Sequence, residues 1–208
     1  YCGWKWQSFM SAQKIRKSTA EDIATAARAA TKGRGLPPVH LWNPAFCGDL
    51  DIRIARDGTW FYLGTPIGRA TLVKLFASIL RKDGDKFFLV TPVEKVGIIV
   101  DDAPFVAIDF TVTGSDKDQV ICFETNVGDY AKASMENPIR FARDEKTEEP
   151  SPYIHIRNGL EALIDRKSFY RLVDLGTQEN IDGEIWFGVF SSGTFFPIIP
   201  SKELEYED

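Results

Sequence analysis

The chain has 208 residues, of which 44% are hydrophobic and 26% charged, and its formal net charge is −5. This length and composition suit a folded protein of one large or two small domains, and the negative charge argues against binding of duplex nucleic acid. No apolar run reaches the length of a membrane span. The three cysteines, Cys2, Cys47 and Cys122, are widely spaced and odd in number, which predicts a reducing, cytoplasmic location without a disulfide framework.

The N-terminal region, residues 1–36, is predicted to be an extension with one helix. Ser18 and Glu21 have the spacing of a capping box, and the alanines that follow favour a helix up to Gly33. This helix has few large apolar residues, which predicts a position on the surface. Residues 1–9 carry no pattern that indicates structure, and we expect them to be a disordered extension.

A hairpin, a helix and a second hairpin are predicted in the first folded unit, residues 37–118. Ile52 and Ile54 alternate with polar neighbours ahead of the turn sequence Asp57-Gly58, which is a strong hairpin signal. Apolar residues then recur at helical spacing from residue 69 to residue 81. Further strands are predicted at 86–92, 94–100, 105–112 and 119–126.

The second folded unit, residues 119–200, repeats this order of elements. IGRATLVKL (67–75) matches IDRKSFYRL (164–172), and DGDKFFLV (83–90) matches DGEIWFGV (182–189). The ordered matches predict a duplicated hairpin–helix–hairpin unit. We therefore expect an α+β fold of two barrel-like units, followed by a tail at 201–208.

Each predicted unit has an arginine at the first position of its helix, Arg69 after Gly68 and Arg166 after Asp165. The helix dipole disfavours a cation there by roughly 0.3–1 kcal/mol. One explanation is a salt bridge, for which Asp51–Arg69 is the preferred structural pair. The other is an anion seat, built from the guanidinium and the free N–H groups of the helix start.

Two chemical alternatives involve the segment around Cys47. A cysteine nucleophile needs a neighbouring histidine, and the chain has only His40 and His155. A metal site from His40, Cys47, Asp49 and Asp51 has enough donors but no recognised ligand spacing. We therefore favour a protein that is not an enzyme and that has no catalytic residues, metal or cofactor.

Four long segments carry a family resemblance. They are HLWNPAFCGDLDIRIARDGTWFYLGTPIGR (40–69), LVTPVEKVGIIVDDAPFVAIDF (89–110), PYIHIRNGLEALIDR (152–166) and FSSGTFFPI (190–198). Over about residues 37–199 the chain resembles the bacterial domain-of-unknown-function family 1285. The resemblance implies an α+β fold with a repeated motif, whose second half is loosely similar to a pleckstrin-homology-type barrel. It also implies a ligand site between the repeats and a role in signal transduction, without an established reaction.

From the residues and the resemblance we predict a non-enzymatic protein that binds a small anion, a nucleotide or another phosphate-bearing metabolite, where the repeats meet. Arg69 and Arg166 would hold the anion, with support from Arg157. Trp42 and Phe195 would form apolar walls. The alternative is a protein-interaction module that binds a partner by a sheet edge without a small ligand. An uncharacterised enzyme is the third hypothesis.

Overall fold

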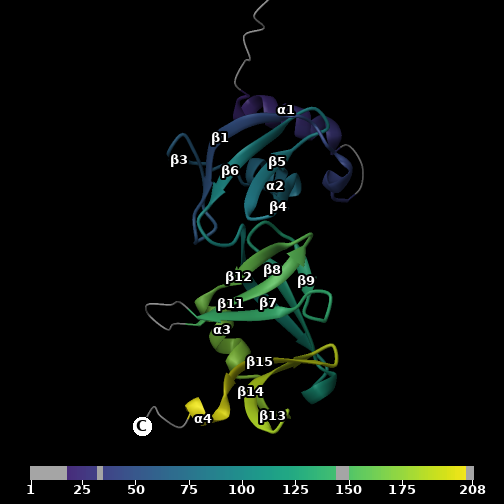
Figure 1. Cartoon of the computed structure of the whole chain (residues 1–208), viewed down its shortest axis with the longest axis vertical. Helices are drawn as coiled ribbons and strands as arrows, with labels where there is room; N and C mark the ends of the chain where they lie inside the picture. Colours follow the sequence, from purple (N-terminus) through teal and green to yellow (C-terminus); the bar gives the residue numbers. More distant parts are fainter. Residues whose placement is uncertain (1–17, 32–34, 144–149, 205–208) are drawn as a thin grey trace, which may run out of the picture.

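The chain is mostly β, and its strands form three sheets that follow one another along the long axis of the molecule (Figure 1). The computed structural model describes residues 18–31, 35–143 and 150–204. The predicted extension at 1–9 and the predicted helix end at Gly33 lie outside these ranges. The helices are short and pack against the sheets. The expected α+β fold is therefore confirmed only in a coarser form, as a β-rich protein with two repeats.

The first sheet contains β1 (Phe46–Ile54), β2 (Trp60–Tyr62), β3 (Thr65–Pro66), β4 (Leu80–Asp83), β5 (Lys86–Val90) and β6 (Lys95–Val100). Its strand order is β3-β2-β1-β6-β5-β4, which is two antiparallel meanders joined at the centre by the parallel pair β1–β6. The predicted hairpins β1–β2 and β5–β6 are confirmed. Gly58, in the first of these turns, has φ +82°, a conformation that favours glycine.

The second sheet contains β7 (Phe105–Thr113), β8 (Val120–Thr125), β9 (Tyr130–Lys132), β10 (Ile139–Arg143), β11 (Pro150–Arg157) and β12 (Leu160–Ile164). Its order is β10-β11-β12-β7-β8-β9, with β7 and β12 parallel at the centre. This is the topology of the first sheet, strand for strand. The sequence-based division placed β7 in the first unit, whereas β7 pairs with β8 and β12 of the second sheet.

Further helices and a small third sheet accompany the two large sheets. They are α2 (Ala70–Ser78), α3 (Arg166–Val173), β13 (Thr177–Ile181), β14 (Glu184–Ser191) and β15 (Thr194–Pro200), with the last helix α4 (Ser201–Leu204) in the region expected to be a tail. Along the chain, a hairpin, a helix and a second hairpin follow one another twice, as β1-β2-β3-α2-β4-β5 and β11-β12-α3-β13-β14. The two large sheets repeat in a different register from this element order, since β1–β6 correspond to β7–β12, and the third sheet has the order β13-β14-β15.

Helix α1 (Ala20–Ala30) lies on the outside of the first unit and buries one face. Its N-cap is Thr19, one residue after the predicted Ser18, because the Thr19 hydroxyl accepts from the Asp22 N–H and the Asp22 carboxylate accepts from the Thr19 N–H. Ile23 and Ala27 are fully buried and α1 packs against α2. Small alanines let the two helices approach closely.

One cluster of buried apolar side chains runs from α1 through both large sheets to the third sheet. Trp60 is buried in it and stacks on Phe76 of α2, with ring centroids 6.2 Å apart. The third sheet is attached by a buried polar contact, in which the Ser191 hydroxyl accepts from the Ile121 N–H and donates to the Ala133 carbonyl. The sheets therefore form one body.

Candidate basic groove between the two units

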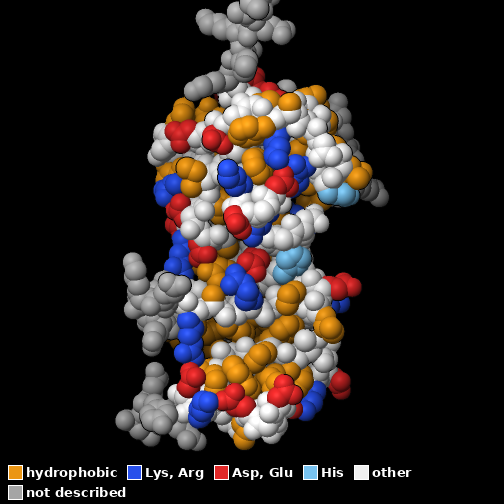
Figure 2. All heavy atoms as spheres, viewed as in Figure 1, with side chains coloured by type: hydrophobic (Ala, Val, Ile, Leu, Met, Phe, Trp, Pro, Cys, Tyr) orange, Lys and Arg blue, Asp and Glu red, His pale blue; other side chains and the backbone are white. Residues whose placement is uncertain are grey.

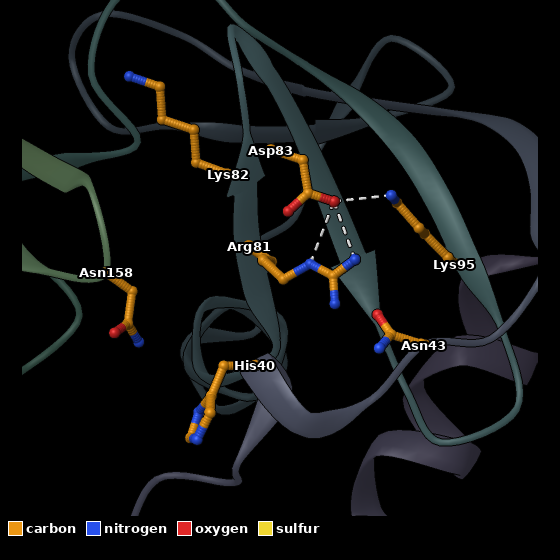
Figure 3. Close-up of a pocket in the computed structure, with 7 residues that line it drawn as sticks. All are labelled: His40, Asn43, Arg81, Lys82, Asp83, Lys95 and Asn158. Atoms are coloured by element: carbon orange, nitrogen blue, oxygen red, sulfur yellow. Dashed lines mark hydrogen bonds and ion pairs between the residues drawn. The ribbon is translucent and has the colours of Figure 1, made fainter.

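A groove of about 480 Å³ lies where the first and second units meet. Most of its lining comes from the first unit, and one residue comes from the β11–β12 turn of the second (Figure 3). On the face shown in Figure 2 the waist between the units is hollowed, and the two histidines of the chain lie on either side of it. The lining residues are His40, Asn43, Arg81, Lys82, Asp83, Lys95 and Asn158.

Strand β4 is an edge strand of the first sheet, and it supplies the centre of the groove wall. Arg81 on β4 donates from Nη1 to the carbonyl oxygens of Trp42, at 2.6 Å, and of Val39, at 3.3 Å. These bonds attach the short 3₁₀ helix Val39–Leu41 to β4. His40 and Asn43 are thereby brought to the groove.

Asp83 is the one carboxylate among the described residues that line this groove. It accepts from Lys95 Nζ at 2.7 Å and from Arg81 Nη2 at 2.8 Å (Figure 3). Burial raises the pKa of Asp83, but the hydrogen bonds from Lys95 and Arg81 outweigh it, so the pKa lies below its ordinary value. The groove thus holds three basic side chains, Arg81, Lys82 and Lys95, and one ionised carboxylate.

Lys82 stands outside this ion-pair network. Figure 3 shows its side chain extending away from the cluster of Arg81, Asp83 and Lys95, and its Nζ lies 5.6 Å from the centre of the Phe87 ring. An anion that enters the groove can therefore meet Lys82 directly. To reach Arg81 and Lys95 it must compete with Asp83.

A second groove, of about 290 Å³, lies on the same boundary between the units. Its lining has two arginines and two aspartates, and all four form ion pairs: Arg56 contacts Asp102 at 3.2 Å, while Arg143 pairs with Glu203 at 2.6 Å and Asp101 with Arg53 at 2.8 Å. Tyr153 donates to Asp102 at 2.8 Å. This balance gives the second groove no surplus of positive charge, so the first is the better candidate for an anion.

The structure places the two predicted anion-binding arginines on different units. Arg69 is the N-cap of α2 instead of its first residue, has extended backbone angles, and is exposed. Arg166 is the first residue of α3, capped by Asp165 as predicted, and its guanidinium donates to the Tyr170 hydroxyl. Because α2 packs against α1 and α3 packs against β7 and β14, the two helix starts do not face each other across one cavity (Figure 1).

The preferred structural pair Asp51–Arg69 is not formed, since no ion pair joins these two described residues. The β1–β2–β3 hairpins place Leu63 opposite Asp51, with the Leu63 N–H donating to the Asp51 carbonyl at 3.0 Å. Arg69 follows several residues later, beyond β3. The neighbouring Arg53 of β1 pairs instead with Asp101, at 2.8 Å.

Arg157 connects the two units. Its guanidinium pairs with Asp129 of the second unit and donates to the carbonyl of Ala77, on α2 of the first, at 2.9 Å. It also lies 5.0 Å from the centre of the Phe105 ring. Arg157 therefore occupies the predicted interface, where its donors are used by protein groups.

The two predicted apolar walls lie in different places. Trp42 is half-buried and directly precedes Asn43 of the groove lining, so it lies beside the groove. Phe195 lies on β15 of the third sheet and packs against Phe190, with ring centroids 5.0 Å apart. Only Trp42 is near the basic groove.

Cys47 and the two histidines form no catalytic arrangement in the described part of the chain. The Cys47 thiol donates to the Ala45 carbonyl at 3.4 Å, while His155 Nε2 accepts from the Gly159 N–H at 3.1 Å. Within residues 18–31, 35–143 and 150–204, no three His, Cys, Asp or Glu side chains are grouped as metal ligands. None of the described helices has the length and apolar character needed to cross a membrane.

The groove residues that sequence reasoning missed are Arg81, Lys82 and Lys95. Arg81 and Lys82 belong to the basic stretch RKDGDK at 81–86, which has the composition of an ordinary solvated turn, and Lys95 begins the separate strand β6. The groove forms because Arg81 bonds the carbonyls of Val39 and Trp42 and because Asn158 of the second unit lies beside this stretch. No local sequence pattern predicts these long-range neighbours.

The fold and the groove define a β-rich protein of two units that share one sheet topology. The sequence profile of the N-terminal DUF1285 domain, described as a domain of unknown function, matches residues 37–103. The profile of the C-terminal DUF1285 domain, described as a protein of unknown function, matches residues 104–198. The chain therefore belongs to the DUF1285 family, which confirms the predicted resemblance. The two profiles meet between β6 and β7, where the first sheet ends and the second begins.

Two solved structures of the same family are similar to this chain. A DUF1285 family protein from Silicibacter pomeroyi DSS-3 is 62% identical, with a TM-score of 0.80, over 88% of this chain and 97% of its own. A DUF1285 family protein from Shewanella baltica OS155 is 32% identical, with a TM-score of 0.47, over 59% of this chain and 90% of its own. No curated protein matches the chain. The first similarity supports both the fold and the family.

Proposed function

We propose that this protein binds a small anion, a nucleotide or another phosphate-bearing metabolite, in the basic groove between its two units, without catalysing a reaction. The observation that supports the proposal is a groove with three cations and one carboxylate, on a chain whose net charge is −5. Lysine and arginine are the side chains that recognise phosphate groups. Lys82, Lys95 and Arg81 thus take the role that sequence analysis assigned to Arg69 and Arg166.

In this proposal the basic side chains and the amides of the groove hold the anion together. Lys82 would offer its ammonium group first, because no described carboxylate pairs with it directly. The anion would then share Lys95 with Asp83, and the amide groups of Asn43 and Asn158 could donate to its oxygens. Because Asn158 belongs to the second unit and the other residues to the first, a bound anion would link the units. Such a link suits a regulatory role in cytoplasmic signal transduction.

Isothermal titration with inorganic phosphate, AMP and ATP tests the proposal. We expect saturable binding to the wild type and at least about tenfold weaker binding to a Lys82→Ala/Lys95→Ala variant, because charge-assisted contacts contribute about 1.5–3 kcal/mol each. Lys86→Ala/Lys132→Ala is the matched control, since both lysines are exposed outside the groove. Equal affinity in wild type and groove variant contradicts this site. Loss of affinity in Arg69→Ala/Arg166→Ala would instead support the anion site predicted from the sequence at Arg69 and Arg166.

A protein-interaction module is the second candidate. It is favoured by β13, an edge strand of the third sheet whose outer side has no partner strand among the described residues. Helix α3 packs between the second and third sheets, and the resemblance of this half to a pleckstrin-homology-like unit would place a partner on such an edge. A stoichiometric partner captured from lysate, and lost in a Glu179→Pro variant of β13, would support this function over the groove. An enzyme is the third candidate, and it would require a turnover that Cys47→Ala abolishes.

A further inference from the structure

The turn between β11 and β12 contains the sequence Asn158-Gly159. Both residues are exposed and have positive φ, +48° and +75°, which is typical of a two-residue type I′ hairpin turn. Asn158 is also the residue through which the second unit lines the basic groove. It is the chain's one asparagine that precedes a glycine, since the other four, Asn43, Asn126, Asn137 and Asn180, precede proline, valine or isoleucine.

A histidine faces the backbone nitrogen of this turn. The Gly159 N–H donates to His155 Nε2 at 3.1 Å, so the lone pair of that ring nitrogen is directed at the amide hydrogen. Asn137 holds the base of the turn, because its Nδ2 donates to the carbonyls of His155 and Ile156 at 2.9 and 3.0 Å. A base is thus within hydrogen-bonding distance of one particular amide proton.

There is also room for the turn to move. An added Cβ on Gly159 would meet no atom within 4 Å, so the space around this residue is open. Ring closure between a backbone nitrogen and the preceding asparagine side chain is least hindered when the residue that carries the nitrogen has no Cβ. The same absence of a Cβ gives glycine the backbone freedom needed to approach the side-chain carbon.

We propose that Asn158-Gly159 is a site of spontaneous deamidation for which His155 acts as the general base. The Gly159 nitrogen attacks Cγ of Asn158 and forms an N–Cγ bond, while its proton passes to His155 Nε2. The Cγ–Nδ2 bond then breaks, and the proton on His155 leaves with the amide nitrogen as ammonia. Water opens the resulting cyclic imide at either carbonyl, giving aspartate or isoaspartate at position 158. One water is consumed and one ammonia is released.

The product changes the groove, a consequence that rests on the proposed function. A carboxylate at position 158 joins Asp83 opposite the three groove cations and removes part of the positive surplus. We expect the modified protein to bind phosphate-bearing ligands more weakly. Deamidation would then act as an irreversible decrease in affinity as the protein ages.

Peptide mapping by mass spectrometry of the full chain, after incubation for days in neutral buffer, tests the modification independently of any ligand. We expect the wild type to gain aspartate and isoaspartate at position 158 faster than at its other asparagines. His155→Gln should slow the reaction by about tenfold or more, because glutamine can accept the Gly159 N–H but is no base. Lys86→Ala, which changes an exposed residue outside the groove, is the control, and it should react at the wild-type rate.

Equal or faster deamidation in His155→Gln, with its melting temperature unchanged, overturns the role of His155. Modification of the other asparagines at the same rate as Asn158 overturns the site itself. Titration of Asn158→Asp with ATP then tests the consequence, for which we expect several-fold weaker binding than in the wild type. If neither protein binds ATP or phosphate while position 158 still deamidates, the proposed function fails and the modification site stands.

Discussion

Arg157 of the second unit donates a 2.9 Å hydrogen bond to the carbonyl oxygen of Ala77, in the last turn of α2 of the first unit. The same guanidinium forms an ion pair with Asp129, and both side chains are mostly buried, with 16% and 21% of their surface exposed. A cation near the C-terminal end of a helix also interacts favourably with the helix dipole. Arg157 is therefore a principal contact between the two units.

Substitution of Arg157 should destabilise the protein much more than substitution of an exposed arginine. We expect Arg157→Ala to lower the free energy of unfolding by about 2–4 kcal/mol, because it leaves Asp129 largely buried without its partner. The control Arg53→Ala breaks the more exposed pair with Asp101 and should cost less than about 1 kcal/mol. Urea unfolding measures both values, and similar costs for the two variants would contradict the assignment.

A second contact between the units joins Gly58 and Asn126, and it can be tested by comparing Gly58 with Gly64. Gly58 and Gly64 both have positive φ, +82° and +74°, so alanine is strained at either position. A Cβ on Gly58 would lie 2.5 Å from Asn126 Nδ2, whereas a Cβ on Gly64 meets nothing within 4 Å. We expect Gly58→Ala to cost about 1–2 kcal/mol more than Gly64→Ala, since it also displaces Asn126, which donates to the Gly58 carbonyl and accepts from Val106. Equal melting temperatures would show that Asn126 moves without cost.

Stability should depend on the ionisation of Glu161. Hydrogen bonds from Arg140 lower the pKa of Glu161 below its ordinary value of 4.5, despite the opposing effect of burial. A lowered folded-state pKa gives stability that is present above the unfolded value and is lost as the pH falls through the folded value. The stability difference between wild type and Glu161→Gln should therefore be largest near neutral pH and shrink below about pH 4.5.

Urea unfolding at a series of pH values measures this difference. Arg140→Gln removes the donor and should flatten the same pH dependence as Glu161→Gln. A difference that stays constant from neutral pH down to acid would show that the Arg140–Glu161 pair does not influence the folded-state pKa.

The start of α1 can be tested with neighbouring residues. Thr19→Ala removes the observed cap and should cost about 1 kcal/mol. Ser18→Ala removes only a hydrogen bond of 3.0 Å to Glu94 and should cost less. Hydrogen exchange of the first-turn amides of α1 reports the difference directly, and faster exchange in Ser18→Ala than in Thr19→Ala would favour the cap that the sequence spacing indicates.

The strands could be predicted because their signals are local. Alternating Ile52 and Ile54 before Asp57-Gly58, and the polar turn between β7 and β8, depend on residues close in the chain. Sheet membership is different, because it is decided by the distant pairs β1–β6 and β7–β12. For this reason the match between β1-β2 and β11-β12 pointed to a two-repeat protein but aligned the wrong strands, because β1 corresponds topologically to β7 and β11 corresponds to β5.

The candidate site could be predicted only in outline. A basic site where the two units meet agrees with the expected location, but the cations of the groove are Arg81, Lys82 and Lys95. Arg69 and Arg166 are conspicuous in the sequence because a cation is unfavourable at the start of a helix. This preference does not determine which surfaces of the protein meet. Arg81 reaches the groove through backbone carbonyls on another segment, and such contacts leave no mark on residue spacing.

The central parallel pairs also affect how the chain can fold. In each large sheet the first strand in the chain pairs with the last. Ile54 of β1 pairs with Val100 of β6, and Ala107 of β7 pairs with Ile164 of β12. Neither sheet can close from local hairpins alone, and long-range pairings of this kind slow folding. During synthesis the first sheet has all its strands once residue 100 has left the ribosome, whereas β7 has no parallel partner until β12 emerges. The first unit can thus be complete while the central strand of the second is still half-paired.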